Sequence, residues 1–263
     1  MSDVLEGGLP AERRKFARAT ARRVLGEGEN RLILILAGIL CVTVSFVACY
    51  LFRVRLFLEM ENEYAVLFSG GAVMLAGWIF LAAPVWLGMY RMAVCMICGV
   101  PVGLTDLFYY CTSARLYGRA IGSTLRICPC WIPILGGIFI FRFAFAIVWL
   151  PVLLLMIVTV LLGAAFSTGF IGFLTRVVAK EEMPLAEAYR GSLGYTVGER
   201  MCFLRFSFGT AVRLFLSCLP VGLVFFLQTL PASMLSGAVY SLRLTESRGD
   251  FEFFPKRSNR YVR

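Results

Sequence analysis

The chain has 263 residues, 59% of them hydrophobic, and a mean hydropathy of +0.80. Ordinary soluble domains are about 45–50% apolar and cannot bury such an excess, so these values exclude an ordinary soluble globular protein. The net charge of +10 fits basic residues that hold membrane topology and contact anionic lipid. We expect no nucleic acid partner, because there is no room for a separate basic domain.

The residue types also limit the chemistry. The chain contains no histidine, the commonest metal ligand and the usual general base near neutral pH, so we expect no metal, no cofactor and no enzymatic activity. Nine cysteines lie scattered in or beside apolar blocks, which is not the pattern of a disulfide framework. Cys95 and Cys98 have the spacing of a redox or zinc pair, but a matching second pair is missing, so we interpret them as packing residues.

Residues 1–31 are polar and basic, and they are predicted to form a cytoplasmic surface helix. Arg14, Arg18 and Arg22 recur every four residues and would form one ridge of that helix. A signal peptide explains the segment poorly, because the apolar run starts late and ends in charged residues rather than in a cleavage site.

Apolar blocks fill residues 32–243, the predicted membrane domain. The first block is long enough to cross a hydrocarbon core of about 30 Å at about 1.5 Å per residue. The sequence therefore predicts an all-α, polytopic transmembrane helical bundle with short cytoplasmic interfacial helices. It has about six spans, followed by a basic cytoplasmic tail, 244–263. The predicted spans are about 32–52, 64–98, 121–141, 145–175, 202–220 and 221–242.

Lys and Arg are distributed unevenly about these spans. With six spans, 22 of the 26 basic residues lie on the side of the two termini, whereas Arg53, Arg55 and Arg142 lie outside. Cytoplasmic segments of membrane proteins carry an excess of Lys and Arg, so both termini are predicted to be cytoplasmic.

The second block and the segment after it contain several local signals. Pro84 is expected to kink a block that is too long for one straight span. Arg91, near the inner end of this block, is expected to reach the headgroups by snorkelling. We place the semi-polar segment 101–126 at the inner interface, where Thr105 is a candidate helix cap.

The stretch 176–200 is the longest charged internal segment and predicts a further surface helix. Pro184 suits its first turn. Leu185, Tyr189 and Leu193 repeat every four residues and give an apolar stripe for the membrane interface. Three acidic residues near the inner interface are interpreted as solvated charges: Asp106, Glu181 and Glu182.

Arg213 stands inside the predicted fifth span, about 16 Å from its start at 1.5 Å per residue. Facing lipid there would cost at least about 2.5–3.5 kcal/mol, so Arg213 should face the bundle interior, a water-filled cleft or a polar partner. It is then a candidate anion or headgroup contact, or a hub for carbonyls near Pro220. The other interpretation is that the helix is shifted and Arg213 snorkels to the outer surface. The apolar blocks contain no Asp or Glu, which disfavours proton-coupled transport.

Three short stretches have a recognisable order of residues. They are APVWLGMYRMAVCMICGVPVGLTDLF, MPLAEAYRGSLGYTVGERMCFLRFSF and, before the first span, ARRVLGEGEN. In this order they resemble an uncharacterised bacterial multi-pass membrane family, domain of unknown function 975. The resemblance implies a multi-pass architecture in the bacterial plasma membrane and brings no established activity. The positions that match its motifs are Asp106, Ser192, Gly198, Arg200, Ser207 and Phe208.

These observations predict a non-enzymatic membrane scaffold, or an accessory protein of transport or envelope processes. The expected partners are anionic lipids at the cytoplasmic face and another membrane protein or a second copy of the chain. The alternative is a carrier of a small molecule, an anion or a lipid, with a cleft around Arg213. An intramembrane enzyme is a weaker third hypothesis, because buried acids and histidines are missing.

Overall fold

A computed structural model describes residues 10–57, 76–127, 172–196 and 225–246, together with residues 202, 205–206, 209–210 and 213. Within these ranges all regular structure is helical, in agreement with the predicted all-α class. Two helices within them are long and apolar enough to cross a membrane, at Gly28–Ala48 and Trp78–Ile97. The predicted spans 121–141, 145–175 and 202–220 lie largely outside the described residues. The predicted span 221–242 is described from residue 225 onward, and it is not one of the two helices that meet this criterion.

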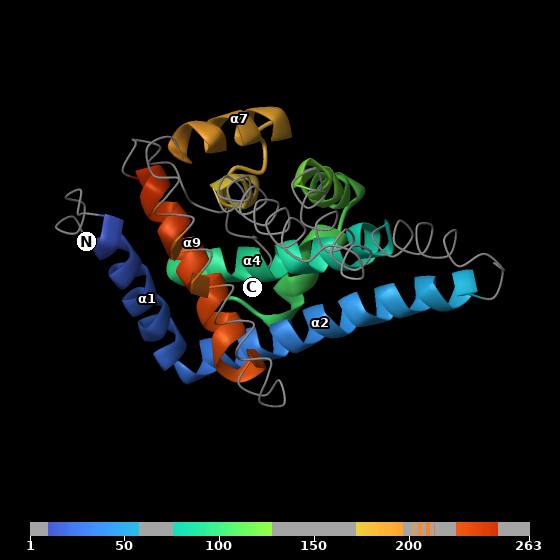
Figure 1. Cartoon of the computed structure of the whole chain (residues 1–263), viewed down its shortest axis with the longest axis horizontal. Coiled ribbons are helices and arrows are strands. Elements are labelled where there is room, and N and C mark those ends of the chain that lie inside the picture. Colours follow the sequence, from blue (N-terminus) through green and yellow to red (C-terminus); the bar gives the residue numbers. More distant parts are fainter. Residues whose placement is uncertain are drawn as a thin grey trace, which may run out of the picture.

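α2 (Gly28–Phe57) contains the first predicted span and is longer than expected at both ends. It follows α1 (Pro10–Gly26) after a bend at Glu27, and the two helices form an L (Figure 1). Arg53 and Arg55 were expected in an external loop, but they belong to the last turns of α2.

α4 (Ala83–Ile97) is the central helix, and nearly all of its side chains are buried. It begins after a π-helical turn, η1 (Trp78–Ala82), with Pro84 in its first turn. Pro84 has no N–H to donate to the carbonyl of Phe80. The hydroxyl of Tyr117 donates to that carbonyl instead, at 2.8 Å. The kink expected at Pro84 stays a prediction, and what the structure shows there is a π-helical turn just before the proline.

α2 and α4 run antiparallel. The indole Nε1 of Trp86, at the start of α4, donates to Ser45 Oγ at 2.8 Å. Later in α4, Met89 lies beside Gly38, so residue numbers fall along α2 as they rise along α4. The N-terminal end of α2 and the C-terminal end of α4 therefore lie at the same end of the pair.

η2 (Leu104–Cys111) returns along α4 after the loop that follows it. Gly88 allows this approach, because a Cβ at that position would lie 1.9 Å from the backbone oxygen of Leu107. The N-terminus of η2 is capped by Asp106, whose carboxylate accepts a hydrogen bond from the Gly103 N–H at 2.9 Å. The expectation for Thr105 was therefore wrong, since Gly103 occupies the cap position.

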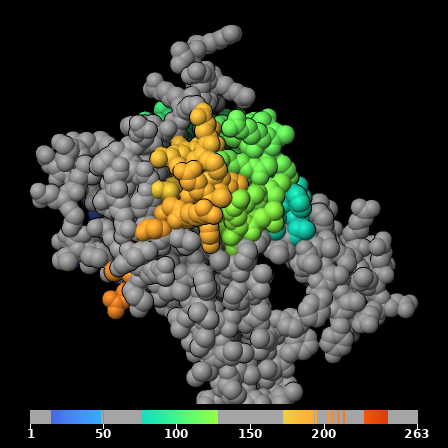
Figure 2. Space-filling view, turned by 90° about the horizontal axis from the view of Figure 1, so that it is seen from above, coloured from blue at the N-terminus to red at the C-terminus, as the bar shows by residue number. Residues whose placement is uncertain are grey.

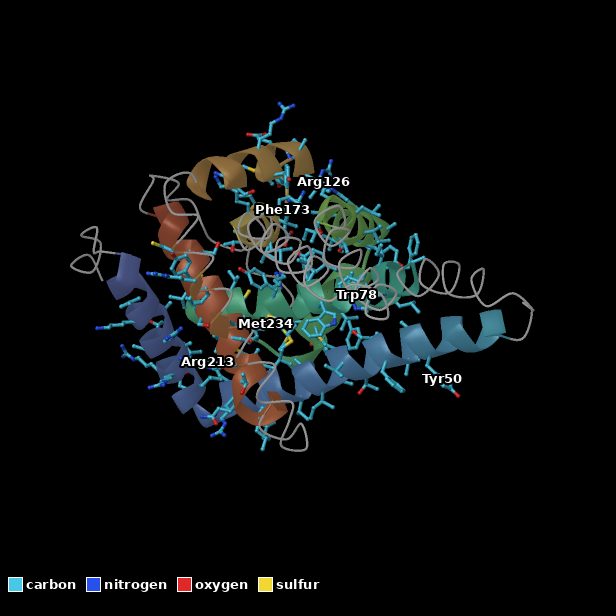
Figure 3. The ribbon with its side chains drawn as sticks, viewed as in Figure 1. Tyr50, Trp78, Arg126, Phe173, Arg213 and Met234 are labelled. Atoms are coloured by element: carbon cyan, nitrogen blue, oxygen red, sulfur yellow. The ribbon has the colours of Figure 1, made fainter. Side chains whose placement is uncertain are left out.

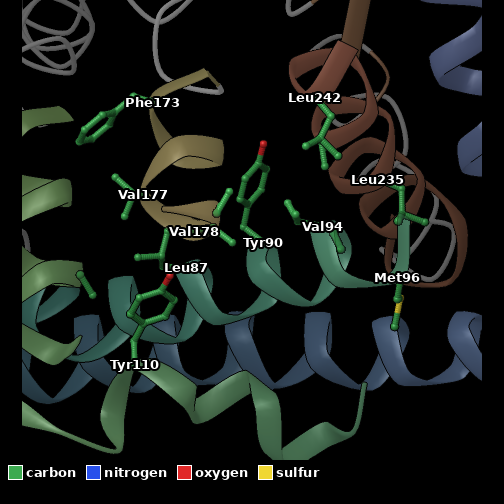
Figure 4. Close-up of a cluster of buried hydrophobic side chains, with 14 of the residues drawn as sticks. Leu87, Tyr90, Val94, Met96, Tyr110, Phe173, Val177, Val178, Leu235 and Leu242 are labelled. Carbon is green, nitrogen blue, oxygen red and sulfur yellow. The ribbon is translucent and has the colours of Figure 1, made fainter. Parts of the chain in front are cut away.

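The main core surrounds α4 (Figure 4). Helical residues 172–179 and α9 (Leu230–Glu246) pack on it, and η3 (Phe225–Thr229) precedes α9. Three buried hydroxyls join these elements, with 2.7 Å from Tyr90 Oη to Thr175 Oγ1 and 2.7 Å from Thr175 Oγ1 to Ser241 Oγ. Buried polar groups need such partners, and the chain fixes the relative register of three helices.

α1 packs lengthwise on α9 rather than lying by itself on a surface. Ala17 contacts Val239 and Tyr240, and the ring of Phe206 stacks on Tyr240 with 4.9 Å between centroids. α1 and α9 run side by side. If α1 lies on a membrane surface, as predicted, α9 therefore lies along the same surface.

α7 (Leu185–Thr196) starts after Pro184, as predicted. Its apolar stripe does not face a membrane interface, because Leu185 and Tyr189 pack on the main core and Phe173 meets the Tyr189 ring edge-on. Figure 2 shows the surface of residues 172–196, in gold, directly beside that of residues 114–127, in green. The side chain of Leu193 lies outside the described set.

We predict that Gly88→Ala destabilises the protein by about 1–3 kcal/mol, because the new Cβ collides with the Leu107 carbonyl and α4 must move away from η2. Thermal unfolding in detergent measures this change. Gly118→Ala is the matched control, since its Cβ meets nothing within 4 Å and alanine favours a helix by up to about 1 kcal/mol. Equal melting temperatures for the two variants would contradict the close approach.

Candidate functional site

Arg213 lines a cavity of about 640 Å³ together with three other arginines, Arg18, Arg22 and Arg31. We call this cavity the basic pocket. Its walls come from α1, the first turn of α2, Thr210, Arg213, η3 and the first two turns of α9. Figure 3 shows Arg213 between α1 and α9.

The sequence of α1 explains why its arginines reach the basic pocket. Ala17 and Ala21 are buried and let α1 approach α9 closely. Arg18 and Arg22 follow each of them by one residue, so they lie at the edge of the buried face. The guanidinium of Arg18 extends toward Gly209, with Nη2 3.9 Å from the place that a Cβ would occupy.

Arg213 lies near the N-terminal end of α2, because Arg31 and Gly26 line the same cavity. Arg213 does line a cavity, and its depth in a membrane and its role there stay predictions. An exposed arginine at this end of the α2–α4 pair escapes the cost of a charge held in hydrocarbon.

The lining of the basic pocket combines cationic and apolar side chains. It contains no acidic residue, while Leu25, Leu227 and Ala232 supply apolar surface. Such a lining suits an anion that carries an apolar part.

A second polar cluster surrounds Arg91, whose side chain is only 4% exposed. The expected snorkelling was wrong. Its Cζ lies 3.7 Å from the centroid of the Tyr109 ring, and its Nε lies 3.7 Å from Oε1 of Glu181. The Tyr109 hydroxyl lies 2.9 Å from both oxygens of the Glu181 carboxylate and donates to them. A carboxylate and an aromatic face together offset the charge of the buried guanidinium.

Two tyrosines at the polar cluster around Arg91 stay protonated. Burial, together with the hydrogen bonds to Glu181, raises the pKa of Tyr109 to about 12, so its hydroxyl remains a donor at neutral pH. Burial also raises the pKa of the neighbouring Tyr110, which is fully buried. Glu181 is 23% exposed and was expected to be a solvated charge, but it holds two partners from other elements.

Arg119 stabilises the turn that presents Glu181. Its guanidinium donates to the carbonyls of Lys180 and Met183 at 2.7 Å each, and more weakly to that of Val177. These carbonyls end the helix 172–179 and begin the turn after it, where a cation is favourable. Burial lowers the pKa of Arg119, but an arginine stays charged. A second cavity, of about 880 Å³, opens between this turn and residues 113–119.

Two of the positions that resemble motifs of the family of unknown function are described, and both have structural roles. Asp106 caps η2, and the buried Ser192 donates to the carbonyl of Tyr189 at 2.7 Å. The remaining motif residues lie outside the described set: Gly198, Arg200, Ser207 and Phe208.

Sequence reasoning did not place Arg18, Arg22 and Arg31 beside Arg213. The regular spacing of α1 arginines was the available signal, but the sequence does not show which distant segment they meet. No family model, no curated protein and no solved structure matches the chain.

We predict that Glu181→Gln lowers the free energy of unfolding by about 1–3 kcal/mol, because it leaves the Arg91 charge buried without a carboxylate. Chemical denaturation in detergent measures the loss. The exposed Glu187 of α7 gives the control, Glu187→Gln, with an expected change within about 0.5 kcal/mol. Replacing both partners, in Arg91→Met/Glu181→Gln, should restore part of the stability. A double variant less stable than Glu181→Gln alone would contradict the pairing.

Proposed function

We propose that the protein is a non-enzymatic integral membrane protein of the bacterial plasma membrane that binds an anionic ligand at its cytoplasmic surface. It acts there as a scaffold, or as an accessory to transport or envelope processes. The observation that carries the proposal is the joining of four arginines from distant segments around one cavity at one end of the α2–α4 pair.

The α2–α4 pair supports membrane insertion. Both helices are long and apolar enough to span, and they are antiparallel. α2 keeps large apolar side chains exposed along much of its length, which hydrocarbon accommodates and water does not. The exposed set includes Leu32, Leu36, Ile39, Phe46, Val47 and Tyr50.

The charge pattern supports a cytoplasmic basic pocket. Arginines of α1 and the first turn of α2 lie at one end of the pair, and basic residues prefer the cytoplasmic side. About six spans with both termini inside remain part of the proposal, as does membership of the family of unknown function.

Two candidate functions make different use of the basic pocket. A carrier needs its ligand to cross the bilayer, and the open cavity around Arg213 favours that alternative. A scaffold or accessory protein holds its ligand on one face. The burial of α4 favours the scaffold, since packed side chains surround the buried guanidinium group of Arg91.

We predict that the protein stays in the membrane pellet after an alkaline wash and that reporters fused to the two termini both report the cytoplasm. Insertion of α2 and α4 with an even number of spans requires this result. A wash that releases the chain, or reporters on opposite faces, would refute the proposed membrane topology.

A leaflet assay separates the scaffold from the carrier. Proteoliposomes with a fluorescent anionic phospholipid in both leaflets are treated with dithionite, which bleaches only the outer leaflet. The scaffold predicts the same bleached fraction as protein-free vesicles. Bleaching beyond that fraction, which disappears in Arg213→Gln, would establish the carrier instead.

A further inference from the structure

The basic pocket concentrates exposed positive charge around one cavity. The side chains of Arg22, Arg31 and Arg213 are exposed, come from three different elements, and have no acidic neighbour in the lining. Positive charges held close together raise the electrostatic potential in the cavity. A ligand group with two negative charges therefore binds there more favourably than a group with one. Guanidinium groups suit phosphate because each can donate two parallel hydrogen bonds.

Three hydroxyls in the lining of the basic pocket already donate to carbonyls of their own helices. Thr210 donates to Phe206 at 2.9 Å, Ser233 to Leu230 at 2.8 Å, and Ser236 to Ser233 at 3.1 Å. The exposed guanidinium groups of Arg22, Arg31 and Arg213 are the charged donors in the lining that can point at a ligand. A ligand whose polar group consists of anionic acceptor oxygens matches this set.

The apolar wall of the basic pocket continues onto α2. Leu227 lines the cavity and is 39% exposed, and Leu32, the residue after Arg31, is 59% exposed. Leu36 and Ile39 continue the exposed apolar face along α2. A ligand seated on the arginines therefore has a hydrocarbon-facing surface beside it, which distinguishes an amphiphile from a free ion.

From this arrangement we infer that the basic pocket binds a phospholipid whose headgroup is a phosphate monoester, with its acyl chains along α2. A phosphate monoester carries about −1.5 to −2 charges near pH 7, whereas the diester of other anionic phospholipids carries about one. This inference rests on the proposed surface role and names the ligand class of the same pocket.

Native mass spectrometry of the full-length protein in detergent tests the inference. Phosphatidic acid, phosphatidylglycerol and phosphatidylcholine of identical acyl chains are titrated separately, and inorganic phosphate is added as a competitor. The pocket variant is Arg22→Gln/Arg213→Gln. The matched control is Arg115→Gln/Arg190→Gln, which removes two exposed positive charges outside the basic pocket.

Phosphatidic acid should bind most tightly, and the pocket variant should weaken its binding by about tenfold or more. The control should bind as the unaltered protein does, and inorganic phosphate at equal concentration should not displace the lipid. Arg213→Lys keeps the charge but loses the paired donors, so its affinity should lie between the two. This single change at an exposed side chain keeps the test valid if the double variant does not fold.

Other outcomes overturn the inference. Equal affinity for phosphatidic acid and phosphatidylglycerol would show that the pocket binds any anionic phospholipid and does not distinguish a phosphate monoester from a diester. Unchanged binding in a folded pocket variant would move the site elsewhere, and displacement by inorganic phosphate would identify a soluble anion. In each case a protein that still passes the alkaline-wash and reporter tests retains its proposed membrane role, so the two failures are distinguishable.

Discussion

The packing around α4 depends on the neutralisation of one buried guanidinium group, that of Arg91. A charge in that position is costly unless a counter-charge and an aromatic face accompany it. Tyr109 supplies the face and orients the Glu181 carboxylate, and Arg119 ties down the turn that carries Glu181. Three segments must therefore come together beside α4 before its charge is compensated: η2, the turn that carries Glu181 and the helix that carries Arg119.

The cost of burying a guanidinium charge is avoided at Arg213 in another way. The lining of the basic pocket contains no carboxylate, and Arg213 is instead exposed at the end of the α2–α4 pair. In the proposed membrane position, water and headgroups would solvate it there. The arginines of α1 and α2 gather at that end because small alanines let α1 pack along α9. A chain with a strong excess of basic residues thus collects part of that excess around one cavity.

The sequence predicted well the features that depend on local composition. The helical class, the position of α2 and the start of α7 after Pro184 each follow from hydropathy or from one residue's backbone chemistry. Features that depend on distant partners were not predictable. Arg91 and Glu181 are ninety positions apart, and Arg213 meets arginines nearly two hundred residues earlier. Snorkelling was the reasonable expectation for Arg91 and solvation for Glu181, because the sequence shows each charge without its partner. Only the tertiary contacts show that the two charges meet.

The central claim is that Arg213 lies at the same end of the α2–α4 pair as the arginines of α1. Cysteine labelling tests it most directly, with Arg213→Cys and Arg22→Cys placed in turn in a chain freed of its native cysteines. An impermeant maleimide should label both positions from the cytoplasmic side and neither from outside. Labelling of position 213 from outside, or its protection from both sides while position 22 reacts, would contradict the account.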